Sequence, residues 1–164
     1  MDKDLLNKFS RQLNDSLDLL NQLKDLAEEE KISLIECDYD ELDSIIKNRD
    51  LILGRFQKTI NDLESTFPML IENKKDGIKT LADLSKFIDE PYSSLFKAFP
   101  EEFNSLVKNI HESNLRNMIV LNHCKELIYD FLCSLAKEVK PNETYSSLGK
   151  ISKPTPPAFI ASSL

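Results

Sequence analysis

The sequence predicts an all-α protein: an antiparallel bundle of about four long helices with a left-handed twist, followed by an extended C-terminal tail. Apolar residues recur every three or four positions through three long stretches, the spacing that lines one face of a helix. The 164 residues include only 3 glycines and no tryptophan, and the β-branched and aromatic runs typical of strands are missing. Short connections between the stretches favour antiparallel neighbours.

The first helix is expected over residues 2–36. Its apolar stripe consists of Leu6, Phe9, Leu13, Leu17, Leu20, Leu23 and Ala27. The pattern breaks at residues 37–40, where Asp40 is a candidate N-cap for a second helix over residues 41–72. Pro68 is expected to kink or end that helix, and residues 73–77 are expected to form a turn.

The last long helix is expected over residues 100–139, because Pro100 suits the first helical position and the two glutamates that follow suit the positive end of the helix dipole. Shorter helical pieces between residues 78 and 99 are expected to fill the fourth position. Mid-stripe side chains of the three long helices should be buried: Leu13, Leu20, Phe56, Leu63, Leu121, Ile128 and Phe131.

Two asparagines, Asn114 and Asn117, fall on the apolar seam of the last helix. A polar residue on such a seam costs stability and tends to fix the register or the partner. The alternative is that the seam shifts at this point to Leu115, Met118 and Ile119.

After residue 140 the composition changes. Four of the 7 prolines fall in residues 141–164, together with many serines, so we expect a helical bundle domain over residues 1–140 and a flexible Pro/Ser-rich tail over 141–164. Proline segments that flank apolar residues are typical of a recognition segment that orders on a partner. The apolar residues in question are Leu148, Ile151, Phe159 and Ile160.

The net charge of the chain excludes one class of partner. The chain has 28 acidic and 21 basic residues, a net charge of −7, which disfavours nucleic acid. No apolar run approaches the ~20 residues that span a bilayer, so no membrane insertion is expected. Three scattered cysteines fit reduced thiols, and the expected location is the cytoplasm.

No constellation of residues supports catalysis. His111 and Glu112 begin like a zinc protease motif, but Leu115 stands where the second histidine is required. Neither a phosphate-binding glycine loop nor an activated nucleophile is present. The sequence therefore predicts a protein that is not an enzyme, with no catalytic residues, no metal site and no cofactor.

Three features occur together: an acidic chain of this size, the segment Glu112-Ser-Asn114-Leu-Arg-Asn117 on a long final helix, and Thr144-Tyr145-Ser-Ser-Leu-Gly149 opening the tail. Together they resemble the FlgN family of flagellar export chaperones. A glycine often follows the tyrosine in that family, and Ser146 stands there in this chain.

The resemblance implies a cytosolic chaperone that binds the hook-filament junction proteins, also called hook-associated proteins, and delivers them to the flagellar type III export gate. It assigns docking at the gate to Tyr145 and Gly149. It assigns client binding to the last helix and the tail, where Leu148, Ile151, Phe159 and Ile160 are the candidates. The alternative is a structural coiled-coil or adaptor module that has no secretion client.

Overall fold

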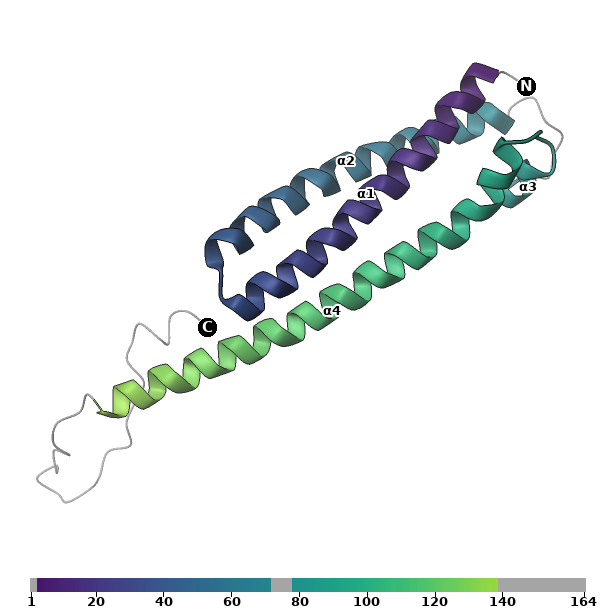
Figure 1. The fold of residues 1–164 in the computed structure, drawn as a ribbon. Helices are drawn as coiled ribbons and strands as arrows, with labels where there is room; N and C mark the ends of the chain where they lie inside the picture. The colour runs from purple at the N-terminus through teal and green to yellow at the C-terminus, as the bar shows by residue number, and fades with distance from the viewer. Residues whose placement is uncertain (1–2, 72–77, 139–164) are drawn as a thin grey trace, which may run out of the picture. The chain divides into compact units, whose positions relative to one another are not determined.

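The computed structural model describes residues 3–71 and 78–138, and within them four α-helices and no strand. The helices are α1 (Lys3–Glu36), α2 (Tyr39–Ile71), α3 (Leu81–Ser85) and α4 (Tyr92–Glu138) (Figure 1). This confirms the prediction of an all-helical protein in which long helices pack together. The predicted turn at 73–77 and the predicted tail at 141–164 lie outside the described residues.

The chain divides into two units, Met1–Met118 and Ile119–Leu164. The first unit contains α1, α2, α3 and α4 as far as Met118. In the second unit the described residues are those of α4 from Ile119 to Glu138.

Three long helices form the core of the first unit. Only residues 37–38 connect α1 to α2, so these two helices run antiparallel, as Figure 1 shows. The helix α4 runs in the same direction as α1. Phe96 packs edge-on against Phe9 near the start of both helices, and Asn117 contacts Ala27 further along both.

The core of this unit is apolar and rich in leucine and phenylalanine. Phe56 of α2 stacks against Phe103 of α4 with a centroid distance of 6.3 Å, which joins the second and third long helices. The most buried large side chains are those of Phe96, Leu13 and Leu84. The further buried members of the core are Leu6, Phe9, Leu17, Leu20, Leu23, Leu26, Ile45, Ile52, Leu63, Leu70, Phe99 and Leu106.

The predicted cap of α2 differs from the structure, whereas the predicted end at residue 72 lies next to the observed end at Ile71. Asp38 accepts the backbone N–H of Glu41 at 3.0 Å, so it takes the capping role predicted for Asp40, which lies inside the helix. Pro68 does not end the helix, which continues to Ile71. Buried Leu70 lies beyond the proline, and its packing favours the continued helix.

The start predicted for α4 at Pro100 is also wrong. The helix begins at Tyr92, and Pro100 lies within it. Glu90 accepts hydrogen bonds from the backbone N–H and the hydroxyl of Ser94, which satisfies a free donor of the first turn. Burial of Phe96 and Phe99 then stabilises the two turns before the proline.

The prediction of buried side chains fails on the second part of α4. Leu13, Leu20 and Leu63 are buried and Phe56 is partly buried. Leu121, Ile128 and Phe131 are 51%, 49% and 64% exposed. Periodicity locates an apolar stripe on a helix, but it does not reveal whether another element lies against that stripe.

Candidate functional site

An exposed apolar stripe is the main candidate for a functional surface in the second unit. It consists of Leu121, Cys124, Ile128, Phe131 and Leu135, and we call these residues the α4 stripe. Their spacing alternates between three and four residues, which is the seam of a coiled coil. Cys124 is partly buried and the other four are exposed. A second helix that packs over such a seam buries its apolar side chains, and this burial lowers the free energy of the pair.

Neighbouring apolar residues widen this face. Leu127 and Leu132 are both exposed and stand beside the α4 stripe on the helix surface, at the positions that flank a coiled-coil seam. Exposed apolar side chains that adjoin one another are typical of an interaction site. The arrangement can bind apolar side chains, and its geometry fits an amphipathic helix.

The opposite face of the same helical segment contains an exposed isoleucine, Ile119. Ile119 lies nine residues before Ile128, which is two and a half turns, so the two isoleucines point in opposite directions. Ile119 is 54% exposed, nearly the same as Ile128. Hydrogen bonding to the Cys133 side chain raises the pKa of Tyr129 above its ordinary value.

The α4 stripe continues a series that is buried in the first unit. The spacing of three and four residues runs along α4 from the start of the helix, through side chains that pack in the core. These residues are Phe96, Phe99, Phe103, Leu106 and Ile110, followed by Ser113 and Asn117. One continuous stripe thus packs inside the bundle in its first part and is exposed in its last part.

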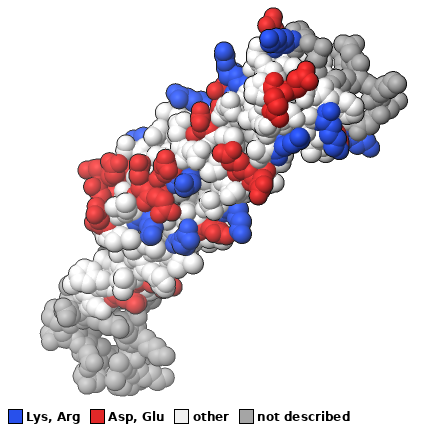
Figure 2. Space-filling view, turned by 45° about the vertical axis from the view of Figure 1, so that its right-hand side comes forward, with Lys and Arg blue, Asp and Glu red and all other residues white. Residues whose placement is uncertain are grey.

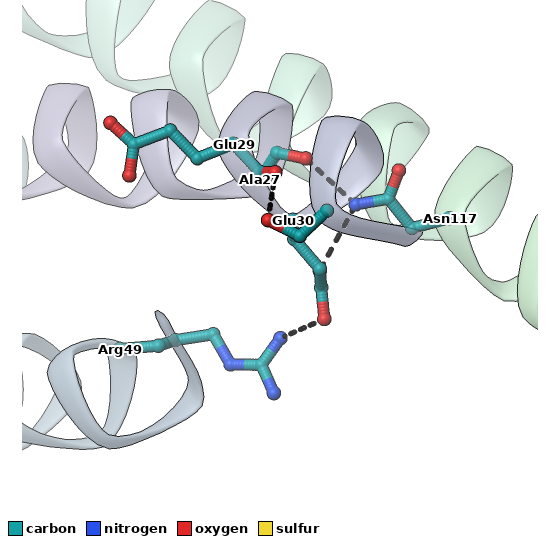
Figure 3. Close-up of polar contacts among 6 residues, drawn as sticks. Ala27, Glu29, Glu30, Arg49 and Asn117 are labelled. Carbon is teal, nitrogen blue, oxygen red and sulfur yellow. Dashed lines mark hydrogen bonds and ion pairs between the residues drawn. The ribbon is translucent and has the colours of Figure 1, made fainter. Parts of the chain in front are cut away.

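A polar layer joins α1, α2 and α4 within the first unit, as Figure 3 shows. Asn117 donates from Nδ2 to the backbone oxygen of Ala27 at 2.7 Å and to a carboxylate oxygen of Glu30 at 3.0 Å. The other carboxylate oxygen of Glu30 accepts from Arg49 of α2 at 3.0 Å. A single buried asparagine therefore connects α4 to an ion pair between the other two long helices.

One turn earlier, the Ser113 hydroxyl donates to Glu28 of α1 at 3.0 Å and accepts from Arg116 at 3.1 Å. The two asparagines singled out by the sequence differ in their surroundings. Asn117 is buried, and its Oδ1 has no hydrogen-bond partner among the described residues. Asn114 is exposed on the surface of α4.

The first unit also contains an apolar groove of about 430 Å³, which the sequence did not predict. It lies where the end of α2 and the segment before α3 approach α1 and α4. Its lining residues are Phe9, Leu13, Ile60, Leu63, Glu64, Phe67, Pro68, Lys79, Thr80, Leu81, Phe99 and Phe103. Only three of them are polar, so the groove suits an apolar side chain.

The tail residues proposed for gate docking and client binding lie outside the described residues. These are Tyr145, Gly149, Leu148, Ile151, Phe159 and Ile160. Residues 3–71 and 78–138 contain no group of three or more His, Cys, Asp or Glu side chains that could hold a metal ion. In the same residues, no helix is long and apolar enough to cross a membrane.

Comparison with known proteins gives one result. A family model described as FlgN protein matches residues 1–153, which is nearly the whole chain. No curated protein and no solved structure matches it.

Proposed function

The chain belongs to the FlgN family of flagellar export chaperones, and from this premise we propose that it binds hook-filament junction proteins in the cytoplasm. It keeps them soluble and unassembled, and it delivers them to the flagellar type III export gate. The observation that carries the proposal is the exposed α4 stripe, because a chaperone for unassembled proteins needs an apolar surface that is free in the absence of its client.

The α4 stripe has the chemistry that client masking requires. An unassembled helix exposes an apolar face that promotes aggregation, and covering that face with a second helix removes it from water. The seam of Leu121, Ile128 and Leu135 offers such a cover with heptad spacing. The net charge of −7 helps to keep the complex dispersed.

Delivery requires a second surface, since the face that holds the client is occupied during transport. We assign gate docking to Tyr145 and Gly149, as the family resemblance implies. The tail residues Leu148, Ile151, Phe159 and Ile160 extend the client-binding face beyond α4. The two functions then lie on neighbouring segments and can be separated by substitution.

The test compares three forms of the chain: the unmodified protein, Tyr145→Ala, and a form lacking residues 141–164. Affinity for a purified junction protein is measured by calorimetry, and secretion of the same protein is measured in cells. Tyr145→Ala should leave the affinity unchanged and reduce secretion, because one aromatic can anchor a small transient interface. Removal of the tail should weaken binding and leave thermal unfolding nearly unchanged.

Thr144→Ala is the matched control, and it should affect neither quantity. Loss of binding in Tyr145→Ala as complete as in the truncated form would place the tyrosine in the client site and contradict the two-surface assignment. Failure of the unmodified chain to bind any junction protein would favour the adaptor alternative.

A further inference from the structure

The turn between α1 and α2 exposes apolar side chains at one end of the first unit. Ile32 and Ile35 are 54% and 62% exposed, and Tyr39 at the start of α2 is 66% exposed. The two isoleucines lie three residues apart on one helix and are therefore neighbours on its surface. They are the only exposed large apolar residues on α1. We call Ile32, Ile35 and Tyr39 the turn surface.

The net charge of the protein is concentrated around this surface. Residues 28–43 contain 8 of the 28 acidic residues and 1 of the 21 basic residues, so the rest of the chain has 20 of each. The excess of seven negative charges thus lies entirely in residues 28–43. Figure 2 shows acidic side chains gathered at the end of the first unit where α1 meets α2.

Some of the acidic residues in this segment form ion pairs with basic residues of α2, and others do not. Glu30 is paired with Arg49 and Asp43 with Lys47. Glu36, Asp40 and Glu41 are exposed and form no ion pair with other described residues.

The position of Glu36 is unfavourable for the stability of α1. It lies in the last turn of the helix, which contains no basic residue. A carboxylate at this end faces the negative pole of the helix dipole, where a cation would be favoured. A local pattern that works against stability is expected where a surface serves a partner.

We propose that the turn surface docks a basic amphipathic helix of a partner protein. Its apolar residues contact Ile32, Ile35 and Tyr39, and its Lys and Arg side chains lie against Glu36, Asp40 and Glu41. Charge complementarity selects this occupant, since the acidic rim attracts a cationic helix and repels a second copy of the same surface. The turn surface belongs to the first unit and shares no residue with the α4 stripe.

The experiment measures binding of a synthetic Leu/Lys amphipathic helix of about 18 residues, or five turns, to the full chain by fluorescence anisotropy. A peptide of the same composition with a scrambled order serves as the probe control. Two variants test the surface. Ile32→Ser with Ile35→Ser removes the apolar part, and Glu36→Gln with Asp40→Asn and Glu41→Gln removes the charged part.

Each variant has a matched control. Leu51→Ser with Leu53→Ser changes two exposed apolar residues of α2 outside the turn surface. Asp18→Asn with Asp50→Asn and Glu102→Gln makes the same change in net charge at exposed carboxylates elsewhere. We expect each turn-surface variant to weaken binding about tenfold and each control less than about twofold. Binding of the unmodified chain should also weaken between about 50 and about 200 mM NaCl.

Three outcomes would overturn the proposal. Equal losses in the two charge variants would show that binding follows net charge alone. Unchanged binding in the isoleucine variant would show that the apolar pair takes no part. An affinity gain after removal of residues 141–164, which changes the net side-chain charge by only one unit, would show that the protein's own tail occupies the surface.

Discussion

Asn117 of α4 donates a hydrogen bond from its Nδ2 atom to the backbone oxygen of Ala27 in α1, at 2.7 Å. The two residues are 90 positions apart in sequence. This bond and the one to Glu30, together with the bond from Ser113 to Glu28, are polar contacts that favour one register of α4 against α1. A shift of α4 by one turn would break both bonds, and a buried amide that loses its partners costs free energy.

Replacement of this asparagine should therefore cost stability. We expect Asn117→Ala to lower the free energy of unfolding by about 1–3 kcal/mol, because both hydrogen bonds across the helix interface are lost. Asn114→Ala is the matched control on the same helix. Its side chain is exposed, so the change should stay within about 0.5 kcal/mol. Chemical denaturation measures both, and equal effects would show that the buried amide does not hold the register.

A pair of leucine substitutions tests which part of the apolar pattern is packed. Leu20 is 3% exposed in α1 and Leu121 is 51% exposed in α4. Leu20→Ala should destabilise the protein by about 2–5 kcal/mol, since it leaves a cavity in a packed core. Leu121→Ala should change stability by less than about 0.5 kcal/mol. A loss above about 2 kcal/mol for Leu121→Ala would mean that the α4 stripe is covered in the free protein.

The helices themselves could be predicted from the sequence because apolar periodicity over thirty residues is a strong signal. Their ends were harder to place. Capping of α4 depends on the Glu90 side chain. The turns before Pro100 are stabilised by burial of Phe96 and Phe99, and Phe96 packs against Phe9, which is distant in sequence. Tertiary packing here overrides a local start signal.

The candidate site could be predicted only in part. The pattern identified both asparagines as polar positions on the seam, but it could not separate them. The difference is that Asn117 is buried against α1 whereas Asn114 is exposed. The α4 stripe was recognised as apolar and wrongly assigned to the core. An apolar stripe has the same spacing whether it packs against another helix of the chain or is exposed and binds another protein.

The capping of α3 gives a prediction about pH. The Thr80 hydroxyl donates to the Asp83 carboxylate at 2.8 Å. This bond, with a smaller contribution from Lys86, holds the pKa of Asp83 below its ordinary value of 3.8. A pKa that is lower in the folded state stabilises the cap above pH 3.8, and the stabilisation is lost as the pH falls through the lowered pKa.

Carboxyl NMR titration checks this prediction directly. In the unmodified chain Asp83 should titrate below 3.8. In Thr80→Ala the pKa should rise toward that value, because the largest cause of the shift has been removed. A native pKa at or above the ordinary value would contradict the capping interaction.

The central claim is that the α4 stripe is the face of this chaperone that binds its client. The most direct measurement is calorimetric affinity for a hook-filament junction protein in two variants, Ile128→Ser and Ile119→Ser. These isoleucines have nearly equal exposure, at 49% and 54%, and lie on opposite faces of one helix. Ile128→Ser should weaken binding about tenfold or more while Ile119→Ser leaves it unchanged. Equal affinities in the two variants would contradict the claim.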